Sequence, residues 1–307
     1  MSSVNVTAAI VTYNRLDLLK ESLAAVLAQT AYLTHILVIN NQSTDGTKEY
    51  LDSLTDPRLI VIHASENLGG AGGFNLAVKQ FITALTDDYV WLMDDDTLPE
   101  PTALEKMVSF ATTHANIGFT QSQVRWRDVN GPAAYMNVVA PRSFYWQDAL
   151  ITPNNPAIEV VNSTFVSVMI PRERVLAVGL PQKEYFIWGD DMEYTNRLVA
   201  DGIHKGYLVL NSLAVHKSKE NLLPGDIITD TDTDRMWRYD YEYRNRILTA
   251  RRIGKKELIK TLLRSGVRDL LKVLLKGNVA YRGKKAGIII RGTWRGLFFK
   301  PSIESAK

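Results

Sequence analysis

Three consecutive aspartates follow an apolar run in the segment YVWLMDDDTLPEP, residues 89–101. Aspartate is depleted in strands, and adjacent carboxylates repel one another unless a cation or hydrogen-bond donors compensate. In an extended segment, Asp94 and Asp96 point to the same side and Asp95 to the other. Hard carboxylate oxygens on one side suit Mg²⁺ or Mn²⁺, with a substrate diphosphate completing the metal's ligands. The alternative is a solvated turn in which Asp96 caps a helix.

A second acidic cluster lies in the segment WGDDMEY, at a predicted helix start. Trp188 and Tyr194 flank Asp190, Asp191 and Glu193. Aromatic rings can stack on a sugar while neighbouring carboxylates accept its hydroxyl hydrogens, and a carboxylate can also act as a general base. The alternative is that Asp190 only caps the helix.

Two weaker signals accompany these clusters. The segment NLGGAGGFN, residues 67–75, could let backbone approach a phosphate closely. It does not fit a dinucleotide fingerprint, because Asn75 replaces the last glycine and the segment follows the third predicted strand, not the first. His216 follows another strand, where it is either structural or a ligand.

The surrounding pattern predicts an α/β fold. Residues 6–13, 35–40, 58–63 and 88–93 are typical of strands, and helical patterns cover residues 16–29 and the stretch ending at Gln80. Such alternation predicts a mostly parallel sheet with helices on both faces, in which ligands bind beyond the carboxyl ends of the strands. The segments TYNR, NNQSTDG, ENLGGAGGFN and DDDTLPEP all occupy that position. Residues 160–171 predict added antiparallel strands, and later helices are predicted from Asp190 to Gly202 and over residues 235–252.

Composition narrows the class of protein. The chain has 307 residues, 46% of them hydrophobic and 22% charged, as in ordinary globular proteins. It has no cysteine, which excludes disulfides, thiolate metal sites and cysteine nucleophiles. The first residues do not form a secretory signal and no apolar run is long enough to span a membrane, so we expect a cytoplasmic protein.

Charge is distributed unevenly along the chain. Residues 251–300 carry 15 Lys/Arg and two acids, a charge of +13, whereas residues 1–250 carry −10. The basic segment places Leu and Ile on one face of a helix, typical of binding to an anionic membrane surface. Packing on the protein's own core or on another subunit, in a homo-oligomer, and nucleic-acid binding are the alternatives. The acidic body and the absence of a nucleic-acid-binding motif argue against nucleic acid.

The order of the motifs resembles that of the inverting family 2 glycosyltransferases of GT-A fold. The motifs are TYNR, VINNQSTDGT, ENLGGAGGFN, WLMDDDTLPEP and FIWGDDMEYTNRL. The resemblance covers about residues 4–217. The three-aspartate form, WGDDMEY, His216 and YDYEYRNR are most similar to bacterial galactofuranosyltransferases and related rhamnosyltransferases. It implies a Rossmann-like GT-A domain at residues 1–217, with the nucleotide-sugar half at about 1–100 and the acceptor half at 101–217. A flexible loop at 218–233 and a basic helical region at 234–307 would follow.

The resemblance also implies roles for residues. Asp94 and Asp96 would bind Mn²⁺ or Mg²⁺ and the nucleotide-sugar, with His216 completing the metal shell. Asp191 would be the catalytic base, Asp190 and Glu193 would orient acceptor hydroxyls, and Trp188 would stack on a sugar. The family usually has an acid at the position of Asn40, which here could accept the uracil N3–H through its amide oxygen. The remaining donor-binding residues would be Thr12, Asn14, Arg15, Asn67, Gly69, Gly70, Gly72, Gly73 and, within the acidic segment, Asp95, for which the geometry predicts a structural role.

These roles imply metal-dependent inverting transfer of a sugar, with galactofuranose the best candidate, from a UDP-sugar to a hydroxyl of a glycan. The acceptor would be linked to a polyprenyl diphosphate, in cell-surface polysaccharide biosynthesis at the inner face of the membrane. Transfer of rhamnose from dTDP-rhamnose is the alternative within the same fold. A sugar nucleotidyltransferase should have a basic glycine-rich loop after the first strand, and TYNRLD is not such a loop.

Overall fold

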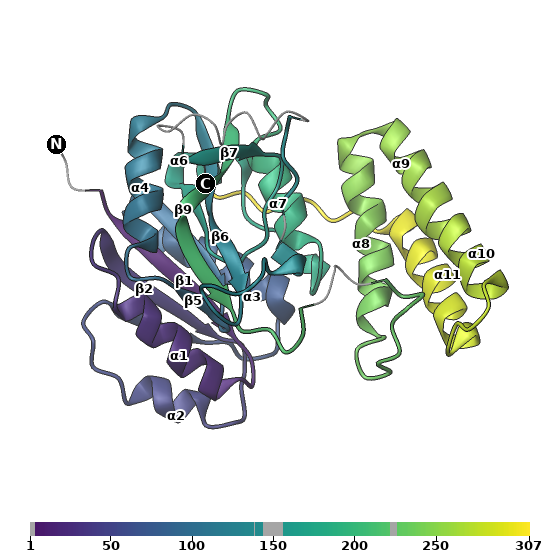
Figure 1. The fold of residues 1–307 in the computed structure, drawn as a ribbon, viewed down its shortest axis with the longest axis horizontal. Helices are drawn as coiled ribbons and strands as arrows, with labels where there is room; N and C mark the ends of the chain where they lie inside the picture. The colour runs from purple at the N-terminus through teal and green to yellow at the C-terminus, as the bar shows by residue number, and fades with distance from the viewer. Residues whose placement is uncertain (1–3, 138, 144–155, 222–225) are drawn as a thin grey trace.

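The structure is a computed structural model that describes residues 4–137, 139–143, 156–221 and 226–307. Its centre is a nine-stranded sheet in the order β3-β2-β1-β4-β8-β6-β9-β5, with β7 paired to β9 (Figure 1). The strands are β1 Val6–Thr12, β2 Leu33–Asn40, β3 Leu59–His63, β4 Tyr89–Asp94, β5 Thr97–Pro99, β6 Ile117–Trp126, β7 Ala157–Val160, β8 Val168–Pro171 and β9 Lys205–His216.

The first four strands of that order are parallel, as the alternating sequence pattern predicts. The second half is mixed: β8 is antiparallel to β4 and β6, and β9 is parallel to β6 but antiparallel to β5 and β7. The mostly parallel α/β fold and the added antiparallel strands are therefore confirmed.

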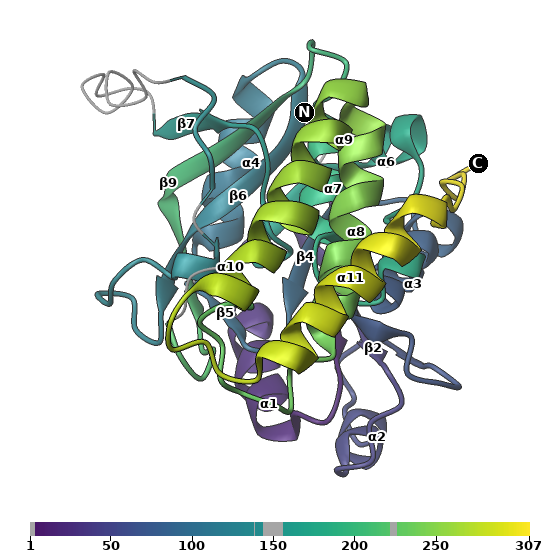
Figure 2. The same cartoon turned by 90° about the vertical axis from the view of Figure 1, so that its right-hand side faces the viewer.

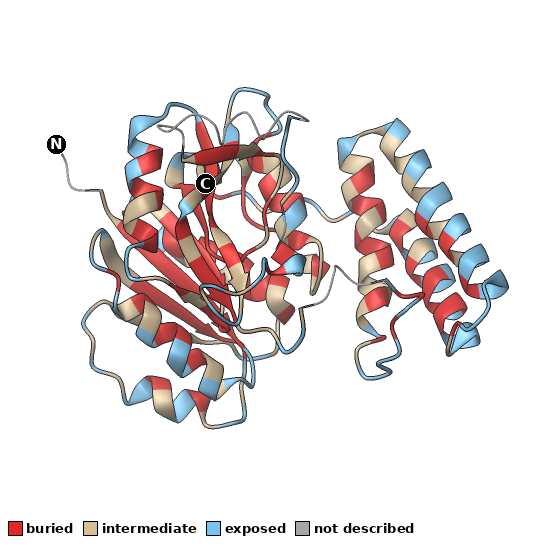
Figure 3. Ribbon diagram, in the orientation of Figure 1, coloured by how far each residue is buried: buried red, intermediate tan, exposed pale blue. Residues whose placement is uncertain are grey.

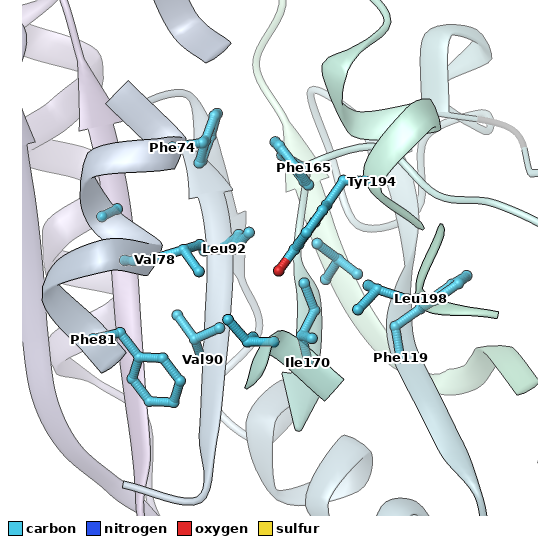
Figure 4. Packing of buried hydrophobic residues seen from close by; sticks show 14 of the residues in the cluster. Phe74, Val78, Phe81, Val90, Leu92, Phe119, Phe165, Ile170, Tyr194 and Leu198 are labelled. Atoms are coloured by element: carbon cyan, nitrogen blue, oxygen red, sulfur yellow. The ribbon is translucent and has the colours of Figure 1, made fainter. Parts of the chain in front are cut away.

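Helices cover both faces of the sheet, because parallel strands are apolar on both sides. Phe74 of α3 and Tyr194 of α7 belong to the core on one face, which Figure 4 shows from close by. Leu19 of α1 and Met107 of α4 belong to the core on the other. The helices of this part are α1 Leu16–Leu27, α2 Thr47–Asp52, α3 Gly69–Ala84, α4 Ala103–Thr113, α6 Arg172–Val178 and α7 Asp190–Leu198, with short 3₁₀ turns η1 Tyr135–Asn137 and η2 Lys183–Tyr185.

Two local predictions were wrong. We expected Gly69–Gly73 to form a loop that leads into the helix ending at Gln80, but α3 already begins at Gly69. The acidic segment is not extended throughout: β4 ends at Asp94, and Asp95 and Asp96 form a turn before β5. The turn nevertheless brings Asp94 and Asp96 together, because β5 pairs with the end of β9 and so places Thr97 opposite His216.

The C-terminal helices stand to one side of the sheet and enclose their own core around Tyr239, Tyr243 and Ile289. They are α8 Arg238–Ile253, α9 Lys255–Thr261, the π-helical η3 Leu262–Arg268, α10 Asp269–Leu275 and α11 Arg282–Phe298. After α11 the chain returns to the sheet domain, as the yellow segment in Figure 1 shows. There the Leu180 N–H donates to the Glu304 carbonyl (2.9 Å) and the Glu304 side chain pairs with Lys79 and Lys183.

Of the segment 218–233, for which we predicted a loop, residues 222–225 lie outside the described residues. Among the helices that the structure describes, none is long and apolar enough to cross a membrane.

Candidate functional site

Asp94, Asp96 and His216 meet at the carboxyl end of β4. One ligand atom from each lies within 4.8 Å of the others. Nε2 of His216 is 3.1 Å from Oδ1 of Asp96, yet that oxygen is buried and has no hydrogen-bond partner among the described residues. A buried carboxylate oxygen without a hydrogen-bond partner is unusual in a protein. Together with the neighbouring histidine nitrogen it forms the kind of ligand set that binds a divalent cation. The group is therefore consistent with a divalent metal site.

Asn137 fixes the orientation of the His216 ring. Its Oδ1 lies 2.7 Å from Nδ1 of His216 and accepts that proton, which turns Nε2 towards Asp96. Its Nδ2 donates to Oγ1 of Thr164 (2.8 Å). Metal-binding histidines characteristically have such a partner on the other ring nitrogen. We did not predict a role for Asn137, because it lies in an irregular segment far from the acidic motifs.

Asp95 is not part of this cluster and contacts the end of β1. It accepts a hydrogen bond from Oγ1 of Thr12 (2.8 Å) and pairs with Nη1 of Arg15 (3.3 Å). The same Arg15 nitrogen lies 2.9 Å from Oδ2 of Asp96. Arg15 therefore joins the end of β1 to the acidic turn and leaves a half-exposed positive charge beside the candidate metal ligands.

Burial dominates the protonation of these acids. It raises the pKa of Asp94, and the neighbouring Asp96 raises it further. It also raises the pKa of Asp95 to about 6, although the charge of Arg15 opposes the rise. Burial opposes ionisation of Asp96 as well, but the nearby His216 and Arg15 outweigh it and the pKa of Asp96 is lowered. A cation at this position would stabilise all the charged forms.

Asn40 lies at the end of β2 but does not present a free amide. Its Oδ1 accepts the N–H of Ser43 (2.9 Å), and its Nδ2 lies 3.0 Å from Nδ1 of His63. Asn40 is 2% exposed. Its side chain thus holds the β2 loop, and the structure does not favour the predicted hydrogen bond from a nucleobase.

Asn14 and Asn67 are likewise loop-forming residues. Asn14 has a positive φ (53°), and its Oδ1 accepts the N–H of Thr44 (2.7 Å). Oδ1 of Asn67 accepts the N–H of Gly69 (2.9 Å) and a hydrogen bond from Nδ2 of Asn41 (3.1 Å). Both shape the edge of the sheet where a nucleotide-sugar is expected.

The glycines let α3 approach its neighbours closely. A Cβ on Gly73 would lie 2.5 Å from Val11, so Gly73 permits α3 to pack on β1. Gly69 has φ +70°, and a Cβ there would lie 2.2 Å from the carbonyl oxygen of Phe186. A Cβ on Gly72 would also be too close to a neighbour, whereas Gly70 has open space beside it. These glycines explain helix packing, and Gly70 alone leaves room for a ligand.

The loop before Asp191 has an unusual backbone. Phe186 and Trp188 have φ of 62° and 63°, values that are costly for residues with a side chain. Gly189 follows with φ 90° and α7 begins at Asp190. The loop therefore holds the acidic residues in a conformation that the isolated sequence would not favour.

Two residues of α8 hold this loop. Nδ2 of Asn245 contacts the carbonyls of Tyr185 (3.1 Å), Ile187 (3.1 Å) and Trp188 (2.9 Å). The Arg244 guanidinium also reaches the Tyr185 carbonyl (3.1 Å) and donates to Oδ1 of Asn245 (3.0 Å). We did not predict roles for Arg244 and Asn245. The only signal was the motif YDYEYRNR, which does not indicate what it touches.

Asp191 lines a cavity of about 720 Å³ between the sheet domain and the C-terminal helices. Burial raises its pKa to about 6, which suits a general base near neutral pH. Burial and the charge of Asp191 raise the pKa of Asp190 to about 8, so Asp190 is mainly protonated at pH 7. Trp188 and Thr164 line the same cavity, and Thr164 links it to Asn137 and the metal ligands.

Glu193 differs from its predicted role. It is 4% exposed and forms ion pairs with Arg197 (3.0 Å) and Arg252 (2.7 Å). Because both oxygens are already paired, Glu193 joins α7 to α8 and is not available to orient an acceptor. Trp188 packs edge-on against Tyr239 with ring centroids 5.2 Å apart, so only part of its surface is free.

The fold and site define a nucleotide-sugar glycosyltransferase of the GT-A type. Residues 7–165 match the glycosyl transferase family 2, and the chain belongs to that family. The galactofuranosyltransferase GlfT1 of Mycolicibacterium smegmatis is 28% identical over 83% of this chain and 85% of the relative. GlfT1 of Mycobacterium tuberculosis is 25% identical over the same shares.

Solved structures show the same fold. GalNAc-T7, solved with UDP, GalNAc and Mn²⁺, superposes with a TM-score of 0.67 over 97% of this chain and 56% of its own, at 14% identity. The Pyrobaculum calidifontis mannosyltransferase PcManGT, solved with GDP-Man and Mn²⁺, gives a TM-score of 0.57 over 97% of this chain and 88% of its own, at 16% identity.

Proposed function

We propose that this glycosyltransferase transfers galactofuranose from UDP-galactofuranose, with inversion, to a hydroxyl of a lipid-linked glycan in cell-surface polysaccharide biosynthesis. The observation that carries the proposal is the placement of a carboxylate base, Asp191, in a cavity whose wall at Thr164 is joined by hydrogen bonds through Asn137 to His216 of the acidic cluster. The choice of sugar rests on the GlfT1 relatives, which cover most of the chain.

The chemistry follows from these positions. Asp94, Asp96 and His216 would hold Mn²⁺ or Mg²⁺, which when bound neutralises charge on the departing diphosphate. Arg15 adds a fixed positive charge at the same end of β4. Asp191 removes the proton of an acceptor hydroxyl, whose oxygen bonds to the anomeric carbon as the bond to the UDP oxygen breaks. A single displacement from the opposite face inverts the anomeric configuration.

The cavity is suited to an acceptor glycan. Trp188 offers part of a ring face to the cavity, whereas Asp190, which precedes the base at the start of α7, is buried and does not line it. The acceptor would be carried on a polyprenyl diphosphate, which places the protein at the cytoplasmic face of a membrane.

Donor binding can be tested without knowing the acceptor. UDP-galactofuranose, UDP-galactopyranose, UDP-glucose and dTDP-rhamnose are compared for the rise in melting temperature with and without Mn²⁺. The proposal predicts the largest metal-dependent rise with UDP-galactofuranose. The largest rise with dTDP-rhamnose would favour a rhamnosyltransferase, and no metal-dependent rise with any donor would contradict the proposal.

A further inference from the structure

One face of the C-terminal helices is apolar and exposed. Every fourth residue from Ile259 to Leu275 is a large aliphatic side chain, and these are between 49% and 78% exposed. The row consists of Ile259, Leu263, Val267, Leu271 and Leu275. Such a contiguous exposed row is unusual on a protein surface and marks a site of interaction.

The π-helical segment keeps this row on one side. In an α-helix, each step of four residues turns about 40° beyond a full revolution, so five such residues would wind around the helix. A π-helix has more residues per turn, and here it occupies the middle of the row from Leu262 to Arg268. Four residues turn through more than one revolution in the α-helical parts and through less than one in the π-helical part. The two rotations oppose one another, so the row stays exposed from end to end.

A basic row runs beside the apolar one, displaced by a single residue. It consists of Lys260, Arg264, Arg268, Lys272 and Lys276, with Lys256 at its start, and all are exposed. Lys260 pairs with Glu257 and Arg268 with Asp269, whereas Arg264, Lys272 and Lys276 have no ion-pair partner among the described residues. The face therefore carries excess positive charge.

Helix α11 adds a second exposed apolar row, made of Ile290, Trp294 and Phe298. In Figure 2, α9, α10 and α11 form the layer nearest the viewer, on the side away from the sheet. Figure 3 shows exposed residues along the outer side of α9 and α10. We call the two apolar rows and the basic row the outer face.

The outer face adjoins the cavity that contains Asp191. Lys260, Arg264, Arg268 and Lys272 line that cavity, and the same residues line the shallow grooves along the apolar row. The basic row is thus the boundary between the cavity and the outer face. A molecule lying against the outer face could reach the cavity by passing that row.

We propose that the outer face docks on an anionic lipid bilayer. Leucine-rich and aromatic side chains would enter the headgroup–acyl boundary, and the adjoining Lys and Arg would meet lipid phosphates. A second copy of this chain fits less well, because a two-fold contact through this face would bring two rows of unpaired positive charge into one interface. Nucleic acid would leave the apolar rows in water. Resting on the proposed function, this docking would present a membrane-embedded acceptor directly to the cavity.

Vesicle flotation of the full chain tests the proposal without any donor or acceptor. Phosphatidylcholine vesicles with and without phosphatidylglycerol are compared at low and high salt. The test variant Leu263→Ser/Leu271→Ser changes two exposed residues that do not line the cavity. Its control is Ile203→Ser, an equally exposed apolar residue in the sheet domain. The charge variant Lys256→Gln/Lys276→Gln is matched by Lys20→Gln/Lys106→Gln on α1 and α4.

We expect binding to phosphatidylglycerol vesicles that weakens with salt. It should fall about tenfold for each leucine removed and about fivefold for each lysine, with both controls unchanged. Equal binding by wild type and test variants, or no binding by wild type, would overturn the proposal. So would a dimer in sedimentation that Leu263→Ser/Leu271→Ser abolishes, or salt-sensitive RNA binding without vesicle binding. The donor-binding measurement is separate, so failure of docking and failure of the proposed function are distinguishable.

Discussion

Asn245→Ala should lower the turnover of the enzyme without lowering its affinity for the donor. The Asn245 amide holds three carbonyls of the loop that precedes Asp191, at 2.9 to 3.1 Å. Removing both N–H donors leaves the Ile187 and Trp188 carbonyls without this partner, at about 2–4 kcal/mol in total, whereas the Tyr185 carbonyl keeps its bond from Arg244. Phe186 and Trp188 store about 1–3 kcal/mol each in their positive φ angles, and the loop would relax once the amide is lost.

The expected fall in kcat of Asn245→Ala follows from these free-energy costs. Even about 2 kcal/mol of lost preference for the observed loop corresponds to a fall of about 30-fold in kcat. The initial rate of UDP release in the presence of acceptor measures this fall, and the Mn²⁺-dependent rise in melting temperature with UDP measures donor binding. Asn245→Asp should be at least as severe, because its carboxylate would face the same carbonyls.

Thr249→Val is the matched control. Thr249 also lies on α8 and contacts the Tyr185 hydroxyl (2.7 Å), but it holds no carbonyl of the loop. Its kcat should fall by much less than that of Asn245→Ala. A folded Asn245→Ala enzyme with near-normal kcat would refute the role assigned to this residue.

Three further predictions concern the same site. Because burial holds the pKa of Asp191 at about 6, this base is protonated in more acidic solution, and kcat should fall about tenfold per pH unit below that value; a flat profile from pH 4 to 8 would contradict this. Asn137→Ala should weaken Mn²⁺ binding, measured by calorimetry with UDP present, about 10–100-fold, and unchanged affinity would exclude its role in orienting the histidine. Glu193→Ala removes the buried carboxylate that the partly buried Arg197 and Arg252 share and should lower the free energy of unfolding by about 3 kcal/mol. Glu193→Gln, which keeps hydrogen bonding, should lose less in the same denaturant titration; equal losses would mean that charge pairing is not the cause.

The sheet and the position of the acidic cluster could be predicted because they depend on local pattern, whereas His216 was expected beside that cluster only from the family resemblance. Strand–helix alternation placed the acidic segment beyond β4, and Asp94, Asp96 and His216 come together there. Asp95 contacts Thr12 and not the other two acids, but a turn places it there and not the side-chain alternation from which we predicted its direction.

The rest depends on contacts between distant segments. The sequence does not show that the Glu193 carboxylate is already paired, because its partner Arg252 lies 59 residues further along the chain, on α8. In the same way, the side-chain amide of Asn40 is already hydrogen-bonded to Ser43 and His63. The glycines of α3 are needed because Val11 and Phe186 approach the helix too closely for a side chain. Side-chain type and spacing indicated that these residues could bind a ligand. They did not indicate which protein groups already contact them.

The most direct test of the central claim compares wild type with Asp191→Asn. With UDP-galactofuranose, Mn²⁺ and a glycan acceptor, we predict that the variant loses acceptor-dependent UDP release by about three orders of magnitude or more, in keeping with loss of a general base. UDP binding in the presence of Mn²⁺ should remain as in the wild type, because Asp191 lies in the acceptor cavity and not among the metal ligands. Near-normal transfer by Asp191→Asn would contradict the account.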